Sequence, residues 1–131
     1  MKIRIVFTVA LTVAVLAAAV ATEADGVTKR IRFAKGKTSA VVSGAVIRGD
    51  VDTYIVGAKA EQMMTVRVTS IEKNASFTVK GPDGEYLQDA GEEDDATLVT
   101  NTLPYNGDYR IEVAPTRGNA TYKLTVKITN N

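Results

Sequence analysis

The sequence contains neither histidine nor cysteine, the side chains that most often supply general bases, nucleophiles and nitrogen or sulfur metal ligands. Their absence excludes Ser-His-Asp triads, Cys-His pairs and histidine-bound metal sites. The catalytic arrangements that remain are a carboxylate pair and a Ser-Lys pair, and neither is visible as a spaced motif. The sequence therefore predicts a protein that is not an enzyme, uses no cofactor and acts by binding.

Carboxylates are the most concentrated of the remaining functional groups. Five of them fall within seven positions, at Asp89, Glu92, Glu93, Asp94 and Asp95. Such a cluster could offer calcium several oxygen ligands, but it lacks the spacing of an EF-hand loop. We interpret it as a solvated loop and predict no metal site, with calcium binding as the alternative.

A second pair of carboxylates, Asp50 and Asp52, flanks Val51 where a strand is expected to begin. Alternate residues of a strand share one face, so a cation could bridge the two side chains. Aspartates at such positions more often accept hydrogen bonds from backbone N–H groups and fix a turn, and we favour that role.

Two loops offer side chains that could contact another molecule. Arg117 and Asn119 lie between two strand-like segments, and an arginine held by rigid strands can form a forked pair with a carboxylate. Tyr105 follows Pro104 in another loop. The structural alternatives are a solvated arginine and a tyrosine that pins its loop to the core.

These loops would be positioned by β-strands, because apolar and polar residues alternate with a period of two along much of the chain. The clearest runs are residues 65–69, 76–80, 109–113 and 122–129, with a shorter run at 30–33. Residues 39–47 and 52–58 are apolar on both faces, and residues 96–103 are an eighth candidate.

Turn residues fall between these runs, and Asn106-Gly107 suits a tight hairpin turn. Gly44 interrupts residues 39–47, which favours a bulge or a close approach of another group. Seven to eight short strands without helical periodicity predict an all-β antiparallel β-sandwich or jelly roll, formed as a single domain by residues 22–131.

The first 21 residues are typical of an export signal. Lys2 and Arg4 precede an apolar run at residues 5–21 that ends in Ala19-Val20-Ala21, which fits the small-x-small cleavage pattern. An uncleaved anchor is the alternative, although the run is at the short edge for a membrane span. We predict cleavage, a periplasmic or extracellular location and no membrane contact afterwards. The nearly balanced charge of the remainder predicts no nucleic-acid partner.

Several runs resemble two related bacterial groups. Residues 49–54 (GDVDTY), 81–84 (GPDG) and 103–109 (LPYNGDY) resemble the pre-peptidase C-terminal domain, in which Asp-x-Asp precedes an aromatic strand. This resemblance implies a small β-jelly roll of the kind appended to exported proteases. It also implies a role in presenting or attaching other proteins or glycans.

The sequence is more similar to the periplasmic inhibitors of g-type lysozyme. The similarity begins at residues 33–36 (FAKG), includes Ser43-Gly44 and residues 50–54 (DVDTY), and ends at Thr116-Arg117 and residues 122–128 (YKLTVKI). It implies a loop surface that enters the glycan cleft of the lysozyme. Arg117 would correspond to the loop arginine of that family and Ser43-Gly44 to its Ser-Gly.

Two positions differ from that family. The loop after Arg117 is short and neutral where the family has a longer, lysine-rich loop, and Gly49 stands where the family has a tyrosine before Asp-x-Asp.

Two functions follow from these observations. The first is inhibition of a lysozyme by a secreted, non-catalytic protein that binds through surface loops. The second is a structural or adhesive module of the cell surface that self-assembles or binds a glycan. The partner is thus a protein, with a glycan as the alternative. The predicted binding residues are Ser43, Gly44, Asp50, Tyr105, Arg117 and Asn119.

Overall fold

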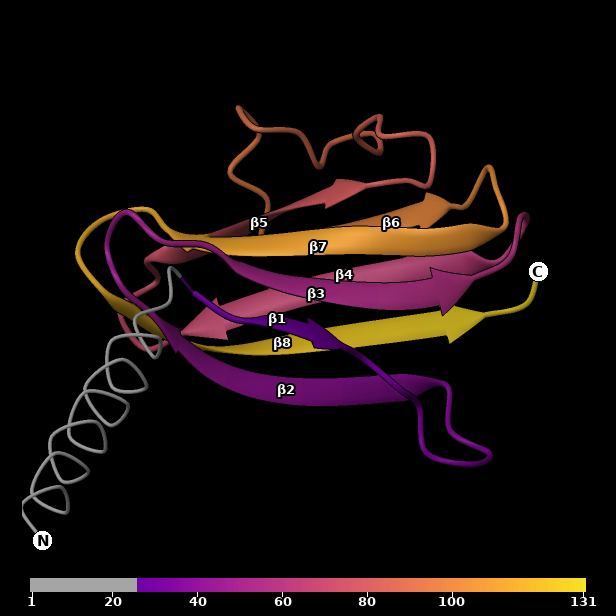
Figure 1. The fold of residues 1–131 in the computed structure, drawn as a ribbon, viewed down its shortest axis with the longest axis horizontal. Helices are drawn as coiled ribbons and strands as arrows, with labels where there is room; N and C mark the ends of the chain where they lie inside the picture. Colours follow the sequence, from indigo (N-terminus) through magenta and orange to yellow (C-terminus); the bar gives the residue numbers. More distant parts are fainter. Residues whose placement is uncertain (1–25) are drawn as a thin grey trace, which may run out of the picture.

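The computed structural model describes residues 26–131, which fold into two four-stranded β-sheets packed face to face (Figure 1). This is the all-β sandwich that the alternating pattern predicted. The predicted signal peptide, residues 1–21, lies outside the described residues. Within residues 26–131, no helix has the length and apolar character needed to cross a membrane. The strands are β1 (Thr28–Arg30), β2 (Ser39–Val46), β3 (Asp52–Ala58), β4 (Met63–Ser70), β5 (Ala75–Lys80), β6 (Leu98–Thr102), β7 (Gly107–Pro115) and β8 (Ala120–Thr129).

Successive strands alternate between the two sheets. Sheet A has the order β1-β3-β7-β5 and sheet B the order β2-β8-β4-β6. Neighbouring strands are antiparallel except β1 and β3, which are parallel. Every connection among these eight strands therefore passes from one sheet to the other.

The prediction of a tight hairpin at Asn106-Gly107 is wrong for this reason. The dipeptide joins β6 of sheet B to β7 of sheet A, so the flanking strands do not pair. The Asn106 side chain serves the connection differently, because its Oδ1 accepts the backbone N–H of Ala60 at 2.7 Å.

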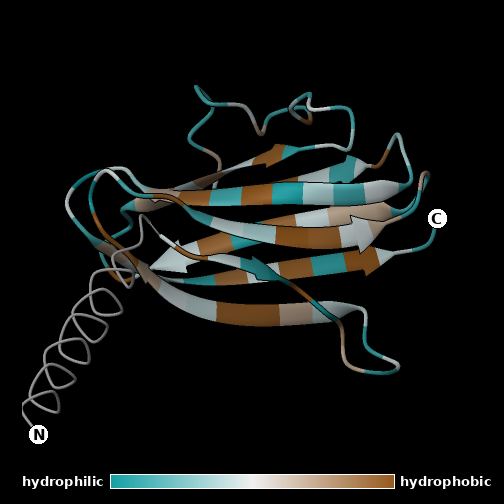
Figure 2. Cartoon of the chain, viewed as in Figure 1, coloured by the Kyte–Doolittle hydropathy of each residue, from teal (hydrophilic) through white to brown (hydrophobic). Residues whose placement is uncertain are grey.

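The core lies between the sheets and is formed by the alternate residues of each strand. In β8, Tyr122, Leu124 and Val126 are buried while Lys123 and Lys127 are exposed. Figure 2 shows this alternation of hydrophobic and hydrophilic residues along the strands. Each fully buried large apolar side chain contributes about 1.5–3 kcal/mol relative to an exposed one, so the two inner faces hold the sheets together without disulfides.

The first strand lies earlier in the chain than predicted. The expected run was residues 30–33, whereas β1 covers Thr28–Arg30. Asp52 and Thr53 at the start of β3 fix this position. Asp52 Oδ1 accepts the N–H of Val27 at 3.0 Å, and the Thr53 N–H donates to Val27 O at 2.7 Å.

Candidate functional site

Three connections gather at one end of the sandwich. Residues 47–51 join β2 to β3, residues 71–74 join β4 to β5, and residues 116–119 join β7 to β8. They lie together on the left of Figure 1, and hydrogen bonds link each to another. We call these three connections the loop end. It contains Asp50, Arg117 and Asn119 of the residues predicted from the sequence.

Two asparagines fasten the loop end. Asn74 is buried, with 3% of its surface exposed, and its Nδ2 donates to the carbonyl oxygens of Arg117 and Asn119 at 3.0 Å each. Asn119 Oδ1 in turn accepts the N–H of Arg48 at 2.8 Å. Both donors of the Asn74 amide are thus used to fix backbone, which makes the three loops one rigid unit.

Arg117 is held in place at the surface of this unit. Its Nη2 donates to the carbonyl oxygen of Glu72 at 2.6 Å, so the β4–β5 connection orients the guanidinium. The bond uses one of the guanidinium N–H donors, and the others remain available to a partner. An arginine oriented before binding loses less side-chain freedom when it pairs with a carboxylate.

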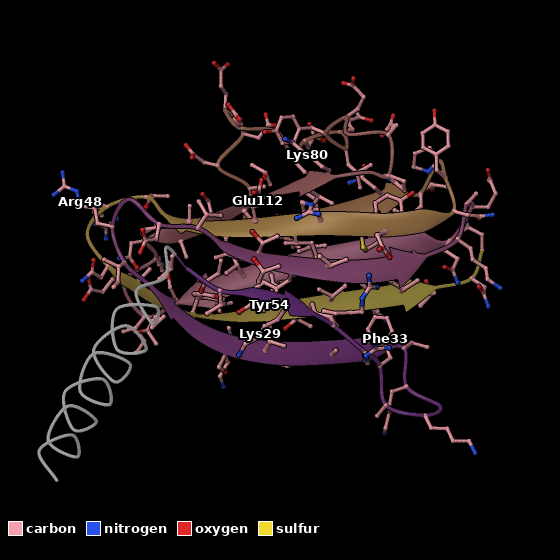
Figure 3. The ribbon with its side chains drawn as sticks, in the orientation of Figure 1. Lys29, Phe33, Arg48, Tyr54, Lys80 and Glu112 are labelled. Carbon is pink, nitrogen blue, oxygen red and sulfur yellow. The ribbon has the colours of Figure 1, made fainter. Side chains whose placement is uncertain are left out.

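Exposed apolar side chains lie on the same end of the sandwich as this arginine. Seven large hydrophobic residues of the described chain are exposed, and three of them, Ile47, Val51 and Ile71, belong to the loop end. Ile71 is 92% exposed, at the tip of a turn closed by the Lys73 N–H bond to Ser70 O at 3.1 Å. Arg48 projects outward from the same end (Figure 3). Arginine beside grouped apolar residues is the composition of protein-binding surfaces.

Ser43 lies in β2 on the outer face of sheet B. It lines a hollow together with Thr69, Ser70, Ile71, Thr121, Tyr122 and Lys123. The hollow covers the end of β4, the start of β8 and the β4–β5 turn that carries Ile71. The structure therefore places Ser43 at the margin of the loop end.

Gly44 has a structural reason to be glycine. A Cβ at this position would lie 2.4 Å from the Tyr122 hydroxyl oxygen, a distance that real Cβ atoms do not adopt. The close approach that the sequence suggested at Gly44 is thus made by the tyrosine on the neighbouring strand β8. Gly44 and Tyr122 face each other in the β2–β8 register.

The Tyr122 hydroxyl belongs to a buried polar network between the sheets. It donates to Asp52 Oδ2 at 2.5 Å and accepts from the Tyr54 hydroxyl at 2.7 Å. Burial, followed by the hydrogen bond to Asp52, raises the pKa of Tyr122 above its ordinary value, and burial also raises the pKa of Tyr54. Asp52 thus fixes structure, as we favoured, because its other oxygen holds the Val27 N–H.

Tyr105 lies at the opposite end of the molecule. It precedes β7 whereas Arg117 follows it, and a nine-residue strand separates its two ends by about 30 Å. The backbone of Tyr105 is fixed by the Tyr109 hydroxyl, which donates to Tyr105 O at 2.7 Å. The structure therefore does not bring Tyr105 together with the other predicted binding residues.

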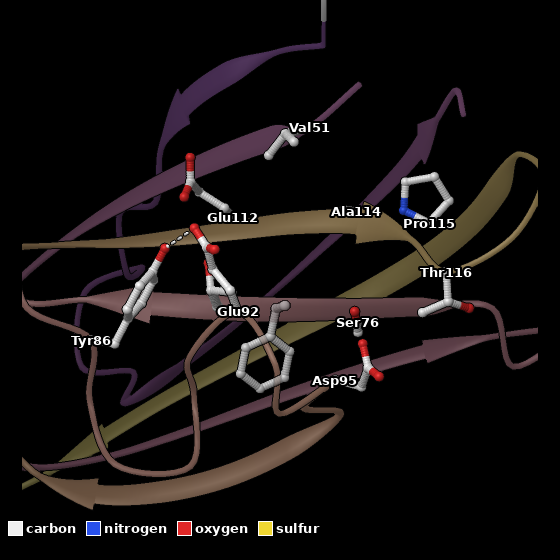
Figure 4. Close-up of a pocket in the computed structure, with 11 residues that line it drawn as sticks. Val51, Ser76, Tyr86, Glu92, Asp95, Glu112, Ala114, Pro115 and Thr116 are labelled. Atoms are coloured by element: carbon white, nitrogen blue, oxygen red, sulfur yellow. Dashed lines mark hydrogen bonds between the residues drawn. The ribbon is translucent and has the colours of Figure 1, made fainter. Parts of the chain in front are cut away.

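The acidic segment lies against the outer face of sheet A. Glu92 and Asp95 line a hollow with Tyr86, Glu112 and Ser76 among others (Figure 4). The Tyr86 hydroxyl donates to Glu92 Oε1 at 2.7 Å, and this bond raises the pKa of Tyr86 to about 12. Within residues 26–131, no group of three or more acidic side chains is arranged to hold a metal ion.

Two residues of the loop end were not singled out as functional from the sequence. Asn74 was visible only as a small polar turn residue, because its partners lie more than forty positions away. Ile71 could have been found as an isoleucine within a polar stretch, since Ser70 and Asn74 on either side of it favour a turn.

Comparisons with known proteins place this fold. No protein-family model matches the chain, and no curated protein matches it by sequence. The pre-peptidase C-terminal domain of a Bacillus anthracis collagenase superposes with a TM-score of 0.56 and 18% identity, over 81% of this chain and 100% of the domain. At that identity, the match shows a shared fold.

Solved structures of periplasmic lysozyme inhibitors of g-type lysozyme, PliG, match more closely than that domain. The Aeromonas hydrophila protein is 30% identical with a TM-score of 0.69, over 81% of this chain and 100% of that protein. The Salmonella Typhimurium protein is 26% identical with a TM-score of 0.63, over 79% of this chain and 99% of that protein. A mutant of the Escherichia coli protein is 25% identical with a TM-score of 0.64 and the same coverage. With 30% identity over the full length of a relative, the chain belongs to the PliG family of periplasmic inhibitors of g-type lysozyme.

Proposed function

We propose that this protein is an exported, non-catalytic inhibitor that binds a g-type lysozyme through its loop end. The observation that supports this most is the combination of family membership with a surface that presents Arg117 and two exposed isoleucines on the same set of linked loops. The names of its relatives support a periplasmic location.

The chemistry of a lysozyme cleft explains why an arginine suits this role. Glycoside hydrolysis is generally carried out by carboxylic side chains that flank the scissile bond in a cleft. A guanidinium pairs with such a carboxylate through two parallel hydrogen bonds. Arg117 reaches out from the loop end, and its contact with Glu72 O directs it. Arg117 therefore pairs with an acidic group in the cleft and blocks the entry of substrate.

The exposed apolar residues of the loop end, above all Ile71, add hydrophobic contact area to the same surface. Ile71 projects from a turn whose end is held by two further bonds, from the Asn74 N–H to Ser70 Oγ at 2.8 Å and from Arg117 to Glu72 O at 2.6 Å. A rigid apolar tip contributes binding energy without a large loss of conformational freedom. Ile71 fills an apolar depression beside the cleft, while Ser43 and Asp50 lie at the margin of the contact.

A competition experiment tests where the protein binds. The Kd of residues 22–131 for a g-type lysozyme would be measured by calorimetry with and without a saturating chitin oligosaccharide in the cleft. Occupation of the cleft should weaken binding at least tenfold. An unchanged Kd would place the contact outside the cleft and contradict the proposed mode of inhibition.

The alternative, a structural or adhesive module, is supported by the likeness to the pre-peptidase domain alone. That likeness is a shared fold at 18% identity. We therefore propose inhibition as the function.

A further inference from the structure

The two sheets end in four edge strands, and three of these edges are short or covered. β1 has three residues and β6 has five. The edge of β5 is occupied by the connection that follows it. The N–H of Leu87 donates to Val79 O at 2.9 Å, the N–H of Val79 to Ala90 O at 3.0 Å, and the N–H of Phe77 to Ala96 O at 3.0 Å. Exposed edge strands invite pairing with another chain, and natural proteins commonly shorten or cover them.

β2 is the fourth edge and has neither form of protection. It has eight residues, SAVVSGAV, with no charged side chain and no proline. It pairs with β8 on one side, and within the described chain no strand lies on its other side (lower margin of Figure 1). Charged residues and prolines are the usual devices that prevent an edge from pairing.

The register identifies the backbone groups that point outward. The N–H of Ile128 donates to Thr38 O at 2.8 Å, so Thr38 faces β8. Backbone groups alternate in direction along an antiparallel strand, so the even-numbered residues of β2 also face β8. The N–H and C=O groups of Ser39, Val41, Ser43 and Ala45 therefore point to the open side, and all four residues are exposed.

We propose that β2 is the self-association surface of this protein, where a second copy adds its own β2 antiparallel across a two-fold axis. The two copies of sheet B then form one continuous eight-stranded sheet. An antiparallel pairing of identical strands uses the same residues on both sides, so each free N–H meets a free C=O.

A second copy fits this edge better than the other edges of the chain do. β1 and β6 are too short to use all the outward groups of β2. Among the edge strands of residues 26–131, β2 alone offers a matching length of uncharged strand with an open side. Val41 of each copy then packs on the outer face beside the small side chains of the other. Antiparallel pairing also points the two loop ends in opposite directions, so both Arg117 residues stay accessible. The inference does not rest on the proposed inhibition, although Ser43 belongs both to this edge and to the margin of the proposed lysozyme contact.

Size-exclusion chromatography coupled to light scattering tests the proposed dimer. The sample is residues 22–131, the predicted mature chain, at concentrations from roughly 1 to 500 µM, because this range covers the dissociation constants of weak homodimers. The expected species is a dimer whose fraction rises with concentration. Val41→Lys places a charge in the middle of the edge and should give a monomer. Its melting temperature should equal that of the native protein at the lowest concentration, where dimerisation adds no stability, because Val41 is 61% exposed. The matched control Thr100→Lys, on exposed β6, should still dimerise.

A second variant tests the backbone rather than the side chain. Ser43→Pro removes an outward N–H and leaves the bonds to β8 in place, so it should also give a monomer. A monomer at every concentration would overturn the proposal. So would a dimer that survives Val41→Lys, or a loss of association in Thr100→Lys equal to that in Val41→Lys.

Discussion

At the residue scale, Arg117 and the groups that hold it show what local sequence can and cannot reveal. The position of Arg117 between two strands was readable from the alternation on either side, since turn residues fall where the alternation stops. The hydrogen bonds from Asn74 that fix the backbone of this loop could not be predicted from the sequence, because Asn74 and Asn119 lie 45 positions apart. Asn74 fixes the neighbouring loop because its side chain is buried against it, and that burial depends on how the strands assemble.

Replacing Arg117 by alanine should weaken binding to a g-type lysozyme strongly. Truncation of an arginine at the centre of an interface costs about 2 kcal/mol or more, which is roughly a 30-fold increase in Kd. The side chain is exposed, so the unfolding midpoint in urea should stay close to that of the native protein. Titration calorimetry measures the Kd.

Arg110→Ala is the matched control, because Arg110 is also exposed but lies on the outer face of sheet A. Its Kd should match that of the native protein. Equal binding by the Arg117→Ala variant would remove Arg117 from the contact.

Tyr122→Phe should destabilise the fold through the buried network. The change leaves Asp52 Oδ2 and the Tyr54 hydroxyl without their shared partner. Loss of one partner from a buried hydrogen-bonded group costs about 1–3 kcal/mol. Urea unfolding measures the difference, with Tyr86→Phe near the surface as a control that should leave the midpoint unchanged. A Tyr122→Phe variant as stable as the native protein would show that the network contributes nothing net.

At the scale of elements, the strands were predictable and their pairing was not. The alternation in residues 76–80 and 122–129 predicted β5 and most of β8, because a strand with one buried face requires a period of two. The sequence of a strand does not show in the same way to which of the two sheets the strand belongs. Asn106-Gly107 has the composition of a hairpin turn, yet it crosses between sheets, because β6 pairs with β4 and β7 with β3 and β5.

Gly44→Ala tests the contact between β2 and β8. The added methyl group would overlap the Tyr122 hydroxyl, so the ring must shift and its bonds to Asp52 and Tyr54 weaken. We expect a loss of about 1–3 kcal/mol in unfolding free energy, measured in urea.

Gly36→Ala is unsuitable as a control because Gly36 has a positive φ of 78°. Gly57→Ala is suitable, since a Cβ there meets no atom closer than 3.5 Å. Equal stability of the Gly44→Ala and Gly57→Ala variants would contradict the packing described for β2 and β8.

At the scale of the whole molecule, three buried tyrosines link stability to alkaline pH. Burial raises the pKa of Tyr54, Tyr109 and Tyr122 above the ordinary value of 10.0. Above pH 10 the tyrosines of the unfolded chain therefore release protons that the folded chain keeps. The contribution of these tyrosines to the free energy of unfolding is complete below pH 10 and decreases as the pH rises above it. Each tyrosine that stays neutral contributes a slope of up to about 1.4 kcal/mol per pH unit.

Urea unfolding between about pH 8 and pH 11.5 measures this slope. The Tyr122→Phe variant should show a shallower decline, because it lacks one of the three groups that titrate differently in the two states. A free energy of unfolding that stays constant across this range would contradict the account of these tyrosines.

The central claim concerns the activity of the whole molecule, and lysis of bacterial cell walls tests it most directly. The predicted mature protein would be added in increasing amounts to g-type, i-type and c-type lysozymes, and the loss of turbidity of a cell-wall suspension would be followed. We predict that lysis by the g-type enzyme falls with increasing protein and that the Arg117→Ala variant has little effect. Undiminished lysis by all three enzymes at micromolar excess of the protein would contradict the proposed function.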